Sequence, residues 1–347
     1  GDSNLCWSYS SSSASEASIL KYGLTDKSPN ELYLNPVATA YRAFKRTSDP
    51  LENTGGDWQS ADYMKATGNP LKAVKLFSMW WGPTESTSAA ENPFENPSFR
   101  FENGFYIPEK DNLDEYISDI KEAVAKYGAV NFQYNNVRET EYYNPRTEKG
   151  SDSFPHACTV IGWDDTIEAD RFSPSAAGRK GGWLVKNSYR SLEYFYLSYE
   201  DKSITNLVSN TAVTTPAYPN NYFYDGAAAG TVTFPGNTIN NGYYVSNIFK
   251  ATAGNGKDEE LGEIVTAVPQ DNTDFQIQVY IDLKNTSDPT SGTPAYAESV
   301  DYTQPLAGIH TIHLNTPVKI PQGTFYSVVI RIPDGSNKFY VEKTTTS

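Results

Sequence analysis

The stretch that decides the fold is residues 1–20, GDSNLCWSYSSSSASEASIL. Cys6 is followed at once by a tryptophan and stands where a run of small residues begins. This pattern indicates a thiol on the first turn of a helix over about residues 5–22. A thiol has an ordinary pKa of about 8.5, and a helix N-terminus beside a cationic partner lowers it enough to give a thiolate near neutral pH. Cys6 is therefore a candidate nucleophile if the chain supplies such a partner.

A histidine and an asparagine follow at suitable distances. The chain has three histidines, and His156 lies in the apolar run SFPHACTVIGWDD, residues 153–165. Asn187 interrupts the next apolar run, GGWLVKNSYR, residues 181–190. The separations are 150 residues from Cys6 to His156 and 31 residues from His156 to Asn187. They fit a nucleophile near a mature N-terminus whose partners lie about 130–150 residues downstream.

These three motifs, in the order Cys, His, Asn, resemble the papain-like cysteine peptidases. The segment IKEAVAKYGAVNFQY, residues 120–134, is similar to that family's helix-then-strand segment. The pair Gly55-Gly56 in NTGGDWQSADYM is similar to the family's glycine pair that lines the cleft. The resemblance covers residues 1–205 and implies an α+β domain of two lobes, with the cleft between a helical lobe and a sheet lobe.

The resemblance also implies a role for each site residue. Cys6 attacks a peptide carbonyl as a thiolate, His156 pairs with it and then protonates the leaving amine, and Asn187 orients the imidazole. The backbone N–H of Cys6 supplies one donor to the oxyanion. Apolar side chains along the cleft favour a hydrophobic residue two positions before the cleaved bond. The residues expected to line the cleft are Gly55, Gly56, Trp58, Phe154, Pro155 and Ala157.

Two departures from the family pattern affect these expectations. The family's oxyanion glutamine stands six residues before the nucleophile, and we expect it immediately upstream of Gly1. The family's Asn-Ser-Trp-Gly is Asn-Ser-Tyr-Arg here, residues 187–190. The tryptophan that would shield the hydrogen bond between the histidine and the asparagine is therefore absent from this position.

Other reactive side chains are expected to be structural. Cys158 follows His156 by two residues in the same strand and has no companion motif, so we interpret it as a core residue or as a residue that supports the site without touching the substrate. His310 and His313 lie in the strand-like run GIHTIHL. A metal pair is one interpretation of these two histidines, and a structural or surface role is the more common one.

The chain after residue 205 differs from the first 205 residues in its sequence pattern. Residues 206–220 are rich in Thr, Asn, Val and Pro and are expected to form a linker. Residues 221–347 contain short alternating runs separated by Gly, Pro, Asn and Asp, which predicts an all-β sandwich. The runs YYVSNIFKA, residues 243–251, and FQIQVYIDL, residues 275–283, resemble the lectin-like β domain that follows the peptidase in bacterial cell-surface cysteine peptidases.

That domain can bind glycans, bind calcium or act as a scaffold. Calcium takes six to eight oxygen ligands, and no ligand spacing here is diagnostic. Exposed tyrosines can stack on sugars, although core packing is their commoner use. The residues considered for calcium are Asp225, Asp258, Glu259 and Glu260, and those considered for sugars are Tyr243 and Tyr244.

Composition excludes several classes of protein. A length of 347 residues favours two domains. The net charge of −14 leaves no basic patch for phosphate backbones, so nucleic acid is not an expected partner. No apolar run approaches eighteen residues, so no transmembrane segment is predicted. Two cysteines cannot build a disulfide framework, and the resemblance, more than composition, predicts a secreted or cell-surface protein of a Gram-positive-like bacterium.

The sequence therefore predicts a hydrolase, a cysteine endopeptidase of protein or peptide substrates that needs no cofactor for catalysis. A cell-wall glycan or a surface protein is a further partner that the resemblance allows. Two alternatives stay open. One is a binding or adhesion module whose peptidase domain is inactive or latent, and the other is a papain-fold hydrolase that cuts peptide or amide bonds of the cell wall.

Overall fold

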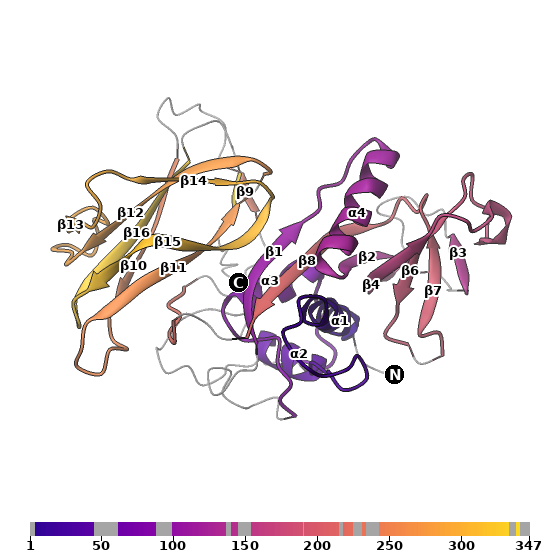
Figure 1. Cartoon of the computed structure of the whole chain (residues 1–347), viewed down its shortest axis with the longest axis horizontal. Coiled ribbons are helices and arrows are strands. Elements are labelled where there is room, and N and C mark those ends of the chain that lie inside the picture. The colour runs from indigo at the N-terminus through magenta and orange to yellow at the C-terminus, as the bar shows by residue number, and fades with distance from the viewer. Residues whose placement is uncertain are drawn as a thin grey trace. The chain divides into compact units, whose positions relative to one another are not determined.

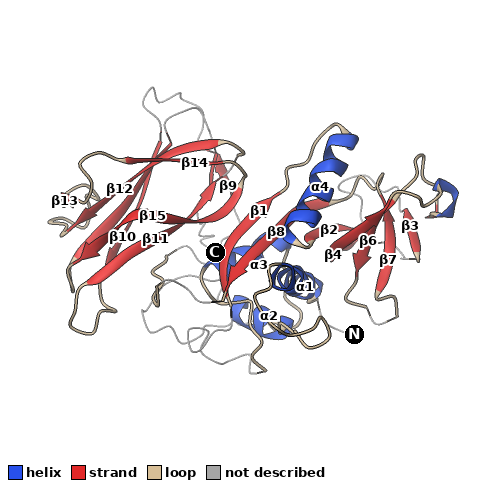
Figure 2. Cartoon of the chain, in the orientation of Figure 1, coloured by secondary structure: helices blue, strands red, loops and turns tan. Residues whose placement is uncertain are grey.

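The computed structural model contains two compact units, residues 1–48 with 56–215, and residues 49–55 with 216–347. In Figure 2 the helices belong to the first unit, and the described part of the second consists of strands and loops. This agrees with the predicted α+β domain followed by an all-β domain. The described residues are 4–44, 62–87, 99–136, 140–144, 154–189, 191–214, 218–224, 231–233, 243–268, 270–332 and 338–340.

The strands of the first unit pair in the order β1-β8-β2-β4-β6-β7-β3-β5. All of these strands except β5 are labelled in Figure 1. Neighbouring strands are antiparallel, except that β3 pairs in parallel with β7 and β5. The bounds are β1 (Arg100–Tyr106), β2 (Val130–Asn136), β3 (Tyr142–Asn144), β4 (Phe154–Asp164), β5 (Ser173–Pro174), β6 (Gly182–Lys186), β7 (Tyr194–Ser198) and β8 (Thr205–Val213).

Two of these strands lie where the sequence predicts no regular structure. Residues 77–108 are rich in Pro, Asn, Ser and Gly, a composition that predicts a long surface loop, but their described part contains β1. The expected linker, residues 206–220, is occupied over much of its length by β8, which pairs with both β1 and β2. Leu207 and Val208 are buried in β8. Thr, Asn and Ser dominate the rest of β8, so its apolar signal in the sequence is weak.

The described part of the first unit also contains four α-helices and one short 3-10 helix. Two of the α-helices lie where the sequence predicts them, over residues 5–22, as given above, and over residues 114–127, an amphipathic run that ends at Gly128. Asn112 caps the second of these by accepting hydrogen bonds from two backbone N–H groups of its first turn, and Gly128 ends it with a φ of 98°. The bounds are α1 (Cys6–Lys21), α2 (Pro36–Phe44), α3 (Pro70–Ser78), α4 (Leu113–Tyr127) and the 3-10 helix Ala169–Arg171.

The other two α-helices differ from the prediction. α2 is expected from residue 30, but it begins at Pro36, because proline suits the first turn of a helix and disfavours helical backbone in the residue before it. A helix is expected over residues 56–66, and the described part of that range, residues 62–66, is not helical. α3 begins instead at Pro70, where the side chain of Asn69 accepts a hydrogen bond from the first turn at 2.8 Å.

α1 is a buried helix in spite of its many serines. Ser8, Ser10, Ser11 and Ser15 each donate a hydroxyl hydrogen to a backbone carbonyl three or four residues earlier. These bonds satisfy hydroxyl groups that burial would otherwise leave unpaired. Because the side chains are small, α1 packs closely on β4, β8, α2 and α3, and these tertiary contacts compensate for weak helix propensity.

The described strands of the second unit are antiparallel, as the alternating runs predict. β16 lies between β10 and β12, β12 also pairs with β13 and β14, β11 pairs with β15, and β9 pairs with β17. The bounds are β9 (Thr231–Thr233), β10 (Tyr243–Lys250), β11 (Glu259–Val268), β12 (Thr273–Ile281), β13 (Thr293–Pro294), β14 (Val300–Gln304), β15 (Gly308–Ile320), β16 (Phe325–Ile332) and β17 (Lys338–Tyr340).

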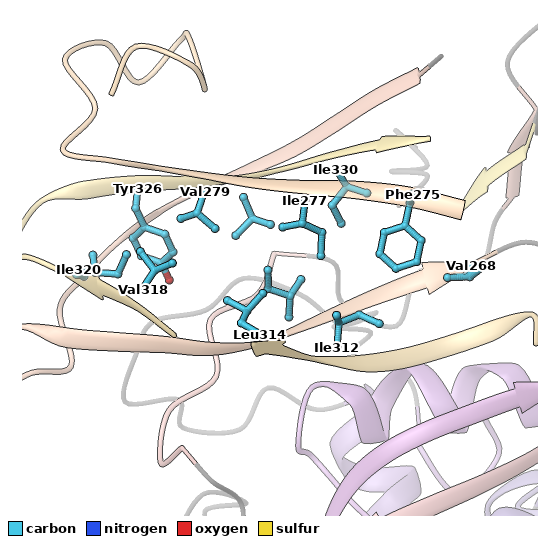
Figure 3. Close-up of a cluster of buried hydrophobic side chains, with 13 residues drawn as sticks. Val268, Phe275, Ile277, Val279, Ile312, Leu314, Val318, Ile320, Tyr326 and Ile330 are labelled. Carbon is cyan, nitrogen blue, oxygen red and sulfur yellow. The ribbon is translucent and has the colours of Figure 1, made fainter. Parts of the chain in front are cut away.

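The core of the second unit lies between two layers of strands (Figure 3). Phe275, Ile277 and Val279 of β12 point toward Ile312 and Leu314 of β15. In both strands the inward residues alternate with outward ones, which is the pattern of a β-sandwich. Among the described residues, none of the helices combines the length and apolar character needed to cross a bilayer.

Candidate active site

Cys6 is the first residue of α1, and the tryptophan after it fixes its position. Trp7 is fully buried, and its ring meets that of Phe44 edge-on, with centroids 6.2 Å apart. Burial of a side chain of this size anchors the start of the helix. Cys6 itself is only partly buried. Cys6 is therefore held in place and keeps part of its surface exposed.

His156 and Asn187 lie side by side in the sheet. His156 belongs to β4, Asn187 follows the neighbouring strand β6, and both are buried. Nε2 of His156 lies 2.8 Å from Oδ1 of Asn187. An amide oxygen only accepts, so this hydrogen bond is donated by Nε2. The backbone N–H of Asn187 donates to the carbonyl of Glu193 at 2.8 Å, which fixes the turn that carries the asparagine.

Cys6 contacts the same imidazole from the helix. The thiol and His156 share a side-chain hydrogen bond, and the backbone N–H groups of Trp7 and Ala157 also bond to the sulfur. Because Nε2 bonds to Asn187, Nδ1 is the ring nitrogen left for the thiol. The structure therefore brings the three predicted catalytic residues into one hydrogen-bonded chain, from Cys6 through His156 to Asn187.

The electrostatics of the pair favour its charged forms. Burial opposes ionisation of Cys6, but the hydrogen bond and charge of His156, with two backbone N–H groups, hold the pKa of the thiol below its ordinary value. Burial also opposes charging of His156, but the sulfur atoms of Cys158 and Cys6 and the oxygen of Asn187 raise the pKa of the imidazole far above its ordinary value. A thiolate beside an imidazolium is a strong nucleophile.

Tyr189 covers one face of the imidazole. Its ring is stacked on that of His156, with centroids 4.6 Å apart and 9° between the planes. Tyr189 is 46% exposed, so its outer face meets solvent. The family's tryptophan is absent from residues 187–190, and the tyrosine supplies an aromatic cover in its place. This cover limits the access of water to the hydrogen bond between His156 and Asn187.

A second group of residues, missed by the sequence interpretation, lies beside the start of α1. Gly68 packs so closely on Trp7 that a Cβ at this position would lie 2.4 Å from the indole ring. The carbonyl of Gly68 accepts a hydrogen bond from Nε2 of Gln133 at 3.4 Å. Gln133 lies opposite Ala157 in the β2–β4 pair, and its Oε1 accepts from Asn206 at 2.7 Å. Gly68 therefore contacts the residue after the nucleophile, and the backbone N–H of Ala157 bonds to the nucleophile itself.

The structure describes three of the six residues predicted to line the cleft, one of them by its backbone alone. Pro155 is exposed and Ala157 fully buried, on either side of His156 in β4. Phe154 begins β4, and only its backbone is described. Gly55, Gly56 and Trp58 lie outside the described residues. Contact with substrate stays a prediction for all six.

A helix-start pattern in the sequence lies directly after Gly68. Gly68 and Asn69 directly precede Pro70, and an asparagine followed by a proline marks the start of a helix. The assignment of Gly55-Gly56 to the cleft stays a prediction, because both residues lie outside the described residues.

The acidic residues considered for calcium have protein partners. Asp258 pairs with Lys319, and Glu259 and Glu260 each accept a hydrogen bond from a tyrosine hydroxyl. Asp225 lies outside the described residues. Within the part of the chain that the structure describes, no group of three or more His, Cys, Asp or Glu side chains could hold a metal ion. Calcium binding stays a prediction.

The two histidines of β15 do not form a metal pair. His310 is buried, and its Nε2 lies 2.8 Å from the carbonyl of Leu306. His313 is exposed, and its Nδ1 lies 3.1 Å from Oε1 of Glu263. Residues three apart in a strand point to opposite faces, so the two imidazoles cannot share an ion.

Comparison with known proteins supports this architecture. A family model described as Lectin like domain matches residues 222–346. A search of curated proteins gives no match to the chain. Residues 222–346 include all the strands described above for the second unit.

Two solved structures share the fold of nearly the whole chain. The clostridial cysteine protease Cwp84 after propeptide cleavage has a TM-score of 0.69 at 18% identity, covering 95% of this chain and 79% of that chain. The cysteine protease and lectin-like domains of Cwp84, a surface layer associated protein of Clostridium difficile, give 0.65 at 18% identity, with coverages of 95% and 71%. Likeness at this identity establishes the fold. The chain has the fold of a papain-like cysteine peptidase domain followed by a lectin-like β domain.

Proposed function

We propose that this chain is a cysteine endopeptidase that hydrolyses peptide bonds through a thiolate on Cys6. The observation that carries the proposal is the hydrogen-bonded chain from Cys6 through His156 to Asn187. Nucleophilic catalysis by a thiol needs a nucleophile, a proton carrier in contact with it and a group that orients the carrier. The fold shared with the cysteine protease Cwp84 supports the same assignment.

The arrangement is suited to acyl transfer in two halves. The Cys6 thiolate adds to the carbonyl carbon of the peptide bond, and the carbonyl oxygen takes the negative charge. His156 gives its Nδ1 proton to the leaving amine as the C–N bond breaks, which leaves the acyl group on sulfur. A water molecule then loses a proton to His156 and attacks the thioester carbon. The carboxylic acid leaves, and the thiolate and imidazolium are restored.

Asn187 and Tyr189 hold the imidazole while it exchanges protons. Oδ1 of Asn187 accepts a hydrogen bond from Nε2 of His156, so the proton that moves is the one on Nδ1, the nitrogen that faces Cys6. Tyr189 lies flat on the ring and restricts its rotation. Both contacts preserve the geometry of proton transfer.

The start of α1 provides positive potential for the oxyanion. Cys6 is the first helical residue, no side chain caps the helix, and its first turn contains no acidic residue. The N–H groups at a helix start lack partners within the helix and carry the positive end of its dipole. We therefore assign the backbone N–H of Cys6 as one oxyanion donor.

The proposed substrate is a protein or peptide whose cleaved bond lies against Cys6 at the start of α1. Pro155 is exposed next to His156 and is a candidate contact on the leaving-group side of the cleaved bond.

We further propose that the enzyme acts outside the cell, at the surface of a Gram-positive-like bacterium. Cwp84 is described as a surface layer associated protein, and this supports the location. In this setting the lectin-like domain would hold the peptidase on a cell-wall glycan or a surface protein.

A cleavage assay tests the proposal against its alternatives. The purified chain and its Cys6→Ala variant are incubated with internally quenched peptides and, separately, with purified peptidoglycan. Peptide cleavage that is lost in the variant supports an endopeptidase. Cleavage of peptidoglycan alone supports a cell-wall hydrolase. Absence of both, with binding of cell-wall glycan by the chain, supports an adhesion module.

A further inference from the structure

A second thiol lies inside the site, and the mechanism above does not use it. Cys158 follows His156 by two residues in β4, so the two side chains lie on one face of the strand. The β4–β6 register pairs Thr159 with Lys186 and thereby brings Asn187 level with Cys158. Cys158 is 1% exposed. The strand pairing itself places this thiol against the catalytic histidine and asparagine.

The sulfur of Cys158 contacts both of these residues. Sγ lies 3.5 Å from Oδ1 of Asn187, a hydrogen bond that the thiol donates, and the same sulfur contacts the imidazole of His156 as an acceptor. Oδ1 accepts two more hydrogen bonds, from Nε2 of His156 at 2.8 Å and from the backbone N–H of Ser188 at 2.8 Å. Three donors therefore converge on one amide oxygen.

This convergence fixes the orientation of the amide. If the amide of Asn187 turned over, its NH2 group would face three donors, and buried polar groups would be left unpaired. The imidazole would lose its acceptor at the same time. Each donor on Oδ1 therefore favours the orientation that catalysis requires, and Cys158 is the donor that comes from the strand of His156.

A buried cysteine is often only a small apolar side chain that fills space. Packing accounts for the burial of Cys158, because Phe132 lies opposite it in β2. Packing does not require the sulfur to point at a polar atom. The contact with Oδ1 is directional, and it is made at the atom that determines how His156 is held.

We propose that Cys158 is a positioning residue, whose thiol donates to Oδ1 of Asn187 and keeps that oxygen facing His156. The inference rests on the proposed peptidase function, since it acts through the same site. Cys158 touches neither the substrate nor the nucleophile in this scheme. Its loss should therefore change the rate of the chemical step and the ease of forming the Cys6 thiolate, and it should leave substrate binding unchanged.

Two variants of similar volume separate the donor role from packing. Cys158→Ser keeps a donor, and Cys158→Ala removes it. For Cys158→Ala we expect kcat to fall about 3–10-fold at constant KM, the effect of one hydrogen bond. The acid midpoint of Cys6 alkylation by a haloacetamide should move up by about 0.5–1 pH unit, which is the same change in the equilibrium. Cys158→Ser should resemble the wild type in both measurements.

Equal losses in the two variants, a larger loss in the serine variant, or no loss in either would overturn the positioning role. Alkylation needs no substrate, so it separates the two proposals. If Cys6 of the wild type fails to react, the proposed function fails and the positioning role fails with it. If the wild type reacts and cleaves peptides while the two variants behave alike, only the positioning role fails. Thermal unfolding of each variant shows whether it is folded.

Discussion

Tyr189 and His156 are stacked in parallel, with ring centroids 4.6 Å apart and 9° between the ring planes. The contact protects a hydrogen bond on which the proposed mechanism depends, between Nε2 of His156 and Oδ1 of Asn187. A hydrogen bond is weaker where water competes for its donor and acceptor. The stacked pair is therefore the first place to test the site.

Removal of the tyrosine ring should slow the chemical step. We expect Tyr189→Ala to lower kcat about tenfold with little change in KM, because water then reaches the imidazole. Tyr189→Phe should keep most of the activity, since the stacked ring remains. Tyr194→Ala is a matched control, because Tyr194 is similarly exposed, at 47%. Equal losses in Tyr189→Ala and Tyr194→Ala, in steady-state assays with a quenched peptide, would contradict the shielding role.

Asn187 should affect catalysis by orienting the imidazole of His156 and not by contacting the substrate. A hydrogen bond to a charged group contributes about 1.5–3 kcal/mol, so we expect Asn187→Ala to lower kcat about 10–100-fold. The acid limb of Cys6 alkylation should move toward neutral pH, because the imidazolium loses a partner that raises its pKa. A higher KM with unchanged kcat would show that Asn187 contacts the substrate instead.

Gly68 should tolerate no side chain. A Cβ at this position would lie 2.4 Å from the buried ring of Trp7, which also fixes Cys6. We expect Gly68→Ala to destabilise the fold by about 1–3 kcal/mol, the usual cost of overpacking, and to slow Cys6 alkylation. Gly162→Ala is the control, since its Cβ would make only ordinary contacts, the nearest at 3.7 Å from Leu184. Similar urea denaturation midpoints for the two variants would refute the close packing.

Asp201 gives the stability of the fold a dependence on pH. The residue is 5% exposed, Oδ1 accepts two hydrogen bonds from Ser203, and Oδ2 has no partner among the described residues. Burial raises the pKa of Asp201 to about 6 from 3.8. Because folding favours the protonated acid, Asp201 stabilises the fold most below pH 3.8, and this contribution falls as the pH rises through 6.

We therefore expect Asp201→Asn to be more favourable at pH 7.5 than at pH 3.5. The difference in its effect on the free energy of unfolding should approach about 3 kcal/mol, the energy that corresponds to the raised pKa. Urea denaturation at both pH values measures this difference, and Asp170→Asn, at an exposed position of the 3-10 helix, is the control. An effect of Asp201→Asn that does not change with pH would show that Asp201 has no raised pKa.

The sequence predicts the framework of the site better than its surroundings. Cys6, His156 and Asn187 are recognisable because each stands in a short motif of its own. The contacts of Tyr189 and Cys158 depend on which strand residues face each other, and this register is not visible in either motif. Local patterns report which face of an element is buried, and they do not report the partner on a distant strand.

The helices and strands also divide into those that the sequence predicts and those that it does not. α1 and α4 have recognisable starts and stops, and the strands of the second unit alternate clearly, so these were predictable. β8 was expected as linker because its polar residues are buried by pairing with β1 and β2 and not by an apolar face of its own. Whether such a segment forms a strand depends on its tertiary contacts more than on its own sequence pattern.

The most direct test of the central claim is the reaction of the folded chain with a papain-class epoxysuccinyl inhibitor near pH 6, followed by intact mass and peptide mapping. The Cys6–His156–Asn187 arrangement predicts a single label on Cys6, none on buried Cys158, and slower labelling in Asn187→Ala. A folded chain whose Cys6 stays unlabelled, or which is labelled equally fast in Asn187→Ala, would contradict a thiolate held ready by His156.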